Sequence, residues 1–139
     1  MKILIVDGQG GNIGRQLVKL IGEAYPDTEL YAVGTNSIAT ANMLKGGSVT
    51  AATGENAAAV ASRKADIIVG PVGIVIADAL MGEVTPSMAA AIGSSNAKRI
   101  LIPINKCDTF IAGVENMSLP DLLSDAILQI GKLISKDAL

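Results

Sequence analysis

Four glycines follow a short apolar run near the start of the chain, and their spacing could hold a phosphate group. They are arranged as Gly8-x-Gly10-Gly11-x-x-Gly14. Glycine permits positive φ angles and a close approach of the backbone to a ligand, and a helix that begins at such a loop offers N–H groups to an anion. A tight strand-to-helix turn without a ligand is the alternative. We predict a phosphate-binding loop made of Gly8, Gln9, Gly10, Gly11, Asn12, Ile13 and Gly14.

A second polar group bears on which nucleotide the loop would hold. In dinucleotide-binding folds an acidic residue about 20 positions beyond the loop accepts hydrogen bonds from the ribose. Thr35, Asn36 and Ser37 stand where that residue is expected. Neutral groups there tolerate a 2′-phosphate, so we expect any dinucleotide preference to favour NADP over NAD. No Arg lies nearby in the sequence to bind that phosphate, and Lys45 could take its place. Alternatively, Ser37 simply caps a helix over residues 38–44.

Few residues are candidates for catalysis. Cys107 is the only cysteine, and Lys106 beside it is a cation that could lower the pKa of its thiol. The chain has no His, which removes the usual base and the usual zinc sites, so we expect no metal. Asp7 could bind a metal or a ribose, and Asp78 with Glu83 could form an acid–base pair. For each of these residues a purely structural role is the alternative.

The composition narrows the classes of partner. The 139 residues are 50% hydrophobic, which suits a single domain over residues 1–139 with a sizeable core. With 11 basic and 13 acidic residues the net charge is −2, so we expect no nucleic-acid partner. Neither a signal peptide nor an apolar run of about 18 residues is present. We therefore expect a cytoplasmic protein that does not contact a membrane.

Apolar runs alternate with segments of helical spacing along the whole chain. The runs over residues 3–6, 29–33, 48–53, 66–69 and 99–104 predict five strands. Because the first and fourth are continuous and the third is polar, we expect a three-layer α/β fold with a doubly wound, mainly parallel sheet in the order 3-2-1-4-5. An antiparallel sixth edge strand is expected over residues 109–114. Ligands bind where the strand order reverses, which adds Gly70 and Pro71 to the candidate site.

Residues 72–81 are almost entirely apolar, and Thr85 and Pro86 after them form a strong helix start. A helix over 72–81 would have little polar face for water. We therefore expect this stretch and the helix over 85–95 to contribute to a homo-oligomer, most simply a dimer. The alternative is a lid over the ligand crevice.

Two resemblances to known families follow from these motifs. The spacing Gly8-x-x-Gly11-x-x-Gly14 resembles the phosphate loop of extended short-chain dehydrogenases/reductases, which implies NAD or NADP binding. That likeness ends at the first helix, because no Tyr-x-x-x-Lys pair occurs. Over its full length the chain resembles an uncharacterised bacterial family of short Rossmann-like proteins, through VDGQGGNIG, GEVTPSMAAAIGSS and ILIPINKC. This second resemblance implies a Rossmann-like fold and no particular reaction.

Three functions are compatible with the sequence. The first is binding of a small phosphate-bearing ligand, either a nucleotide or a phosphorylated metabolite, on the glycine loop. The second is a small NADP(H)-dependent oxidoreductase, and the third is a structural subunit whose loop is vestigial. We favour the first, because the ribose-binding acid, the Tyr-Lys pair and a separate substrate domain are all missing from the sequence.

Overall fold

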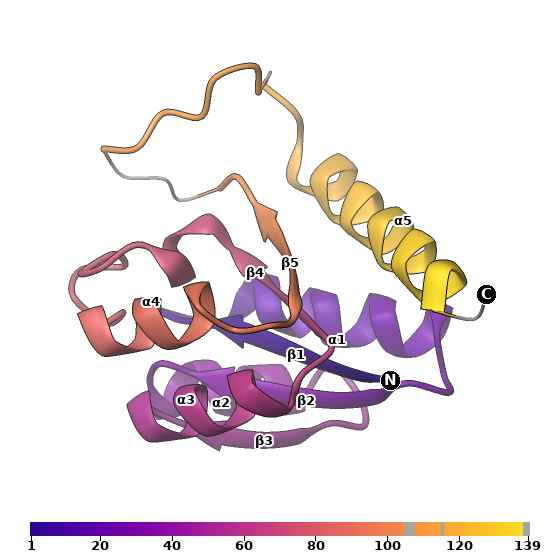
Figure 1. The fold of residues 1–139 in the computed structure, drawn as a ribbon, viewed down its shortest axis with the longest axis horizontal. Coiled ribbons are helices and arrows are strands. Elements are labelled where there is room, and N and C mark those ends of the chain that lie inside the picture. The colour runs from indigo at the N-terminus through magenta and orange to yellow at the C-terminus, as the bar shows by residue number, and fades with distance from the viewer. Residues whose placement is uncertain (105–107, 115, 138–139) are drawn as a thin grey trace.

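The computed structural model describes residues 1–104, 108–114 and 116–137, and a parallel sheet lies at its centre (Figure 1). The strand order is β3-β2-β1-β4-β5, which confirms the predicted Rossmann-like arrangement. Every neighbouring pair in the sheet is parallel. The strands are β1 (Lys2–Asp7), β2 (Glu29–Gly34), β3 (Thr50–Thr53), β4 (Ile67–Pro71) and β5 (Lys98–Ile102).

Residues 3–6 of β1 are all apolar because both faces of the strand are covered. Ile3 and Ile5 lie in one core cluster, whereas Leu4 and Val6 lie in the other. All four side chains are fully buried. Alternation toward two buried faces is what a central parallel strand requires, and it explains why this run shows no polar residue between its hydrophobic ones.

Helices cover both faces of the sheet. The first core cluster joins β1 to α1, α2 and α5, and the second joins it to α3, α4 and the short 3-10 helix η1. The helices are α1 (Asn12–Ala24), α2 (Ser37–Leu44), α3 (Glu55–Lys64), η1 (Val72–Val75), α4 (Pro86–Gly93) and α5 (Leu119–Asp137). Among the described residues, none of these helices is both long and apolar enough to cross a membrane.

The expected sixth strand over residues 109–114 is wrong. The described residues 108–114 form turns and irregular backbone, and the connection in which they lie extends away from the sheet (Figure 1). Gly113 takes a φ of +80°, and the side chain of Phe110 is 92% exposed. Because Phe110 and Val114 are exposed and Ile111 is only partly buried, burial does not favour a strand here.

Residues 72–81 do not form one continuous helix. η1 ends at Val75, and the chain then turns through left-handed backbone at Asp78, Leu80, Met81 and Gly82. Ile74 and Leu80 are buried against the second face of the sheet. Part of the apolar stretch is therefore covered within one chain, whereas Met81 is 95% exposed. The dimer stays a prediction.

Candidate functional site

Asp7 fastens the glycine loop to the end of β1. Its buried carboxylate accepts a hydrogen bond from the Gly8 N–H at 2.8 Å and another from the Gly14 N–H at 2.7 Å. Burial raises the pKa of Asp7, these two hydrogen bonds oppose the rise, and the negative charge of Glu83 adds to it. One side chain thus joins the strand end to the first turn of α1 and sets the shape of the loop between them.

Three of the loop glycines are required by packing inside the chain. A Cβ at Gly8 would lie 2.6 Å from Oγ1 of Thr35, and one at Gly11 would lie 2.6 Å from the backbone oxygen of Ala39. A Cβ at Gly14 would collide with the side chain of Met43. Gly11 also has a φ of +74°. The spacing of these glycines therefore has a structural cause that does not depend on a ligand.

Gly10 differs from the other three glycines. Among the described residues, apart from Gly10 and its two chain neighbours, no heavy atom lies within 4 Å of the position that its Cβ would take. Its carbonyl accepts a hydrogen bond at 2.8 Å from Nδ2 of Asn42 on α2. Arg15 extends the same network, because its Nη1 donates to Oδ1 of Asn42 at 3.5 Å. An exposed cation therefore lies next to the loop on the α2 side.

A pocket of about 210 Å³ opens beside this loop. Within residues 1–104, 108–114 and 116–137, the backbone N–H groups of Gly10, Asn12 and Ile13 have no hydrogen-bond partner. These residues, with the rest of the loop, make one wall of the pocket. The lining consists of residues 7–13 together with Leu80, Ile104 and Leu119. Unpaired N–H groups at the start of a helix are suited to an anion.

A carboxylate occupies the end of β2, although no acidic residue follows that strand in the sequence. Oε1 of Glu83 accepts hydrogen bonds from Oγ1 of Thr35 at 2.7 Å and from Nδ2 of Asn36 at 2.6 Å. It also accepts one from the Gln9 N–H at 2.9 Å. The expectation that this place lacks an acid was therefore wrong, because the acid arrives from the connection between β4 and α4.

The other residues predicted around β2 have structural roles. Asn36 is the N-cap of α2, since its Oδ1 accepts a hydrogen bond from the Ala39 N–H at 2.8 Å. Ser37 is the first residue of the helix, so the expectation that it caps the helix was wrong. Lys45 follows the last turn of α2, about 12 Å along the helix axis from its start, and does not replace an Arg at the site.

The remaining candidate residues do not join the site. Gly70 and Pro71 are buried at the end of β4 and do not line the pocket. A Cβ at Gly70 would collide with the backbone oxygen of Val6. Asp78 is exposed, and no hydrogen bond links it to Glu83 in the described part of the chain. Lys106 and Cys107 lie outside the described residues.

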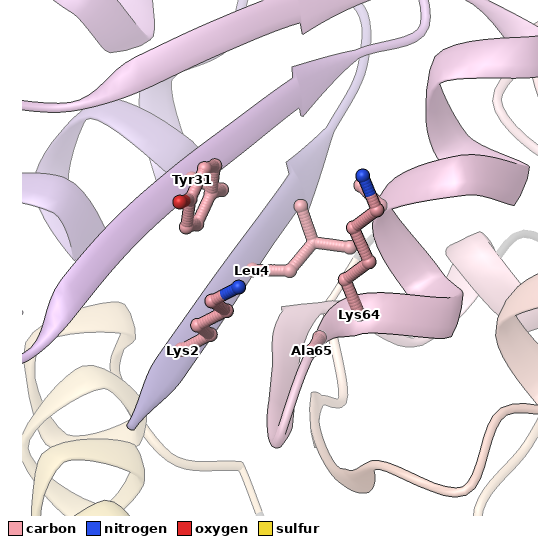
Figure 2. Close-up of a pocket in the computed structure, with 6 residues that line it drawn as sticks. Lys2, Leu4, Tyr31, Lys64 and Ala65 are labelled. Atoms are coloured by element: carbon pink, nitrogen blue, oxygen red, sulfur yellow. The ribbon is translucent and has the colours of Figure 1, made fainter.

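A second pocket lies at the opposite edge of the sheet, near the start of β1 (Figure 2). It has a volume of about 140 Å³, and Lys2 and Lys64 are its charged residues, near Leu4 and Tyr31. Ligands of open α/β sheets bind outside the carboxyl ends of the strands. We therefore place the candidate site at the glycine loop.

Across the residues that the structure describes, no cluster of His, Cys, Asp or Glu could hold a metal ion.

Comparison with known proteins gives a family and no function. A family model described as a domain of unknown function, DUF3842, matches residues 2–135, which is nearly the whole chain. No protein of curated function matches the chain. The site must therefore be interpreted from its own geometry.

Proposed function

The chain belongs to the DUF3842 family, whose function is unknown, and we propose that it binds a nucleotide or a phosphorylated metabolite through the loop of residues 8–14. The observation that carries the proposal is that the N–H groups of Gly10, Asn12 and Ile13, which line the pocket, have no hydrogen-bond partner among the described residues. Backbone donors at a helix start complement the charge and the oxygen acceptors of a phosphate group.

The volume of the pocket limits which part of a ligand it can enclose. Its volume of about 210 Å³ is below the roughly 300–1,000 Å³ of pockets that enclose a drug-sized ligand. A phosphate or a diphosphate fits within it, and the rest of a nucleotide would extend along the open edge of the sheet. Arg15 adds a positive charge beside the loop. We therefore expect the phosphate part of the ligand to supply most of the affinity.

The packing of the glycines favours a second candidate function. Because Gly8, Gly11 and Gly14 all face atoms of the same chain, the loop could serve only as a close-packed joint between β1, α1 and α2. This is the structural-subunit hypothesis, and it requires no ligand. The two functions differ in a single measurable property, which is whether the wild-type protein binds phosphate-bearing compounds.

A pair of glycine substitutions tests the proposal. Gly10 has open space around its Cβ position, so Gly10→Asp places a carboxylate beside the unpaired N–H groups without a clash. Gly93→Asp is the matched control, because Gly93 also has open space and ends α4 at the other edge of the sheet. Lys64→Ala tests the second pocket. Calorimetry and thermal shift with pyrophosphate, adenosine 5′-diphosphate, NAD and NADP give the readout.

We expect wild type, Gly93→Asp and Lys64→Ala to bind the same compound with similar affinity and Gly10→Asp to bind it at least about ten-fold more weakly, because like charges repel. A ligand at 100 times its Kd should stabilise the wild-type fold by about 2.7 kcal/mol. If no phosphate-bearing compound stabilises the wild type, the loop is a structural joint. If Lys64→Ala removes binding while Gly10→Asp does not, the site is at the second pocket.

A further inference from the structure

We infer that Glu83, which adjoins the glycine loop through the Gln9 N–H but does not itself line the pocket, determines the specificity of this site. We infer that it accepts hydrogen bonds from the ribose hydroxyl groups of a nucleotide and disfavours nucleotides with a 2′-phosphate. This inference rests on the proposed function and names the class of ligand more closely. It reverses the preference for NADP over NAD that Thr35, Asn36 and Ser37 predict when they are considered alone.

The position of Glu83 is fixed by three donors from two parts of the chain. The Gln9 N–H comes from the glycine loop, and the hydroxyl of Thr35 and the amide of Asn36 come from the end of β2. All three donate to the same oxygen, Oε1. In the described part of the chain the other oxygen, Oε2, accepts no hydrogen bond, so it retains its capacity for a ligand.

The carboxylate therefore stands where dinucleotide-binding folds place an acid. In those folds the acidic residue belongs to the end of the second strand and binds the ribose, while the adjoining glycine loop holds the phosphates. Here Thr35 and Asn36 occupy the strand end, but both donate to Glu83 instead of remaining open for a phosphate. Their hydrogen-bonding capacity is directed at an internal anion, which leaves a negative charge at this place.

Residues 78–84, the segment that carries Glu83, are joined to one another by backbone hydrogen bonds and are partly buried in the core. The Asp78 N–H donates to the Val84 carbonyl at 2.7 Å, and the Val84 N–H donates to the Ala79 carbonyl at 3.2 Å. Leu80 and Val84, on either side of Glu83, are buried in the second core cluster. A carboxylate on such a segment is preorganised, because little conformational freedom is lost when a ligand meets it.

The charge state of Glu83 is consistent with this role. Partial burial acts to raise its pKa, but the hydrogen bonds from Thr35, Gln9 and Asn36 outweigh that effect and hold the pKa below its ordinary value. Glu83 is therefore ionised at neutral pH. An ionised carboxylate accepts from hydroxyl groups and repels a phosphate placed against it.

The test compares two nucleotides that differ only at the 2′ position. Adenosine 5′-diphosphate and its 2′-phosphorylated counterpart are titrated by calorimetry into wild type, Glu83→Gln and Asp78→Asn. Glutamine keeps an oxygen acceptor and the length of the side chain while removing the charge. Asp78→Asn removes the same charge from the same segment, and Asn tolerates the left-handed backbone at this residue, where φ is +64°.

We expect wild type and Asp78→Asn to prefer the nucleotide without the 2′-phosphate by about ten-fold or more, and Glu83→Gln to lose that preference. A preference unchanged in Glu83→Gln, or wild-type preference for the 2′-phosphate, would overturn the inference and leave the proposed function standing. Binding of pyrophosphate but of neither nucleotide would also overturn the inference and leave the proposed function standing. If the wild type binds none of these compounds, the proposed function fails and this inference fails with it.

Discussion

Two neighbouring carboxyl groups, Asp7 and Glu83, have pKa values displaced in opposite directions. Burial raises the pKa of Asp7, and the charge of Glu83 raises it further. The pKa of Glu83 lies below its ordinary value, because its three hydrogen bonds outweigh its partial burial. The two shifts differ because desolvation outweighs the hydrogen bonds to Asp7, whereas hydrogen bonds outweigh desolvation at Glu83. The lowered pKa of Glu83 favours its ionised form.

The stability of Glu83→Gln relative to wild type should depend on pH. A carboxyl group with a lowered pKa stabilises the fold above its unfolded-state pKa, near 4.5, and this contribution is lost as the pH falls through the lower, folded-state value. At pH 7 we expect the variant to be about 1 kcal/mol less stable, since the carboxylate is partly screened by water. The difference should vanish in strong acid. Urea unfolding from pH 7 to pH 3 measures it.

The pH dependence of Glu83→Gln has a second contribution, from Asp7. Part of the effect is offset by Asp7, because removing the negative charge at Glu83 makes ionisation of Asp7 easier. A Glu83→Gln variant that is destabilised equally at pH 7 and pH 3 would contradict the assignment of a lowered pKa to this carboxyl.

Gly11 and Gly10 should respond differently to the same added methyl group. Gly11→Ala forces a side chain against the backbone of Ala39 in left-handed backbone, so we expect a loss of about 1–3 kcal/mol in the free energy of unfolding. Gly10→Ala meets open space and should change it by less than about 0.5 kcal/mol. Chemical denaturation of both variants measures the difference. Equal stability of the two would show that the loop is looser than the structure indicates.

At the scale of elements, the segment between η1 and α4 has two successive residues with opposite surroundings. Leu80 is 2% exposed and packs in the core, whereas Met81 is 95% exposed. Both residues have left-handed backbone. Replacing each of them by Ala therefore compares the loss of a buried side chain with the loss of an exposed one in the same backbone conformation. The pair therefore separates a role in the core from a role at the surface.

We expect Leu80→Ala to lower the free energy of unfolding by about 2–5 kcal/mol, as for other buried leucines, and Met81→Ala to change it by less than about 0.5 kcal/mol. Thermal unfolding of the two variants is a sufficient measurement. If both substitutions were neutral, the segment would be a mobile lid of the kind that we considered from the sequence, and Glu83 would not be held in place by its neighbours.

The sequence predicts most of these elements because their signals are local. The continuous run of Ile3 to Val6 identifies a doubly covered strand, and Thr85 with Pro86 marks the start of α4, where Oγ1 of Thr85 accepts from the Met88 N–H at 3.1 Å. The strand expected over residues 109–114 was wrong, and the conformation of residues 72–81 could not be predicted, because apolar composition does not say what packs against a segment. For the first stretch the sheet lies underneath, and for the second the described residues are exposed.

At the scale of the whole molecule, the strand order was predictable because the hydrophobicity of each strand indicates how deeply that strand is buried in the sheet. The position of Glu83 was not, because its hydroxyl partner Thr35 lies 48 residues away along the chain, and no periodicity or motif relates the two. The glycine loop is an intermediate case. Its existence could be predicted, but the spacing of Gly8, Gly11 and Gly14 alone could not show that it is satisfied by internal packing.

The central place of β1 has a consequence for how the protein forms during synthesis. β2 can pair with β1 as soon as residues 29–34 leave the ribosome, but the opposite edge of β1 is covered only by β4, at residues 67–71. In the interval a growing chain exposes an apolar, unpaired strand edge, which is the kind of surface that chaperones bind and that aggregates. The rate of translation between these two strands should therefore affect how much of the protein reaches the native state.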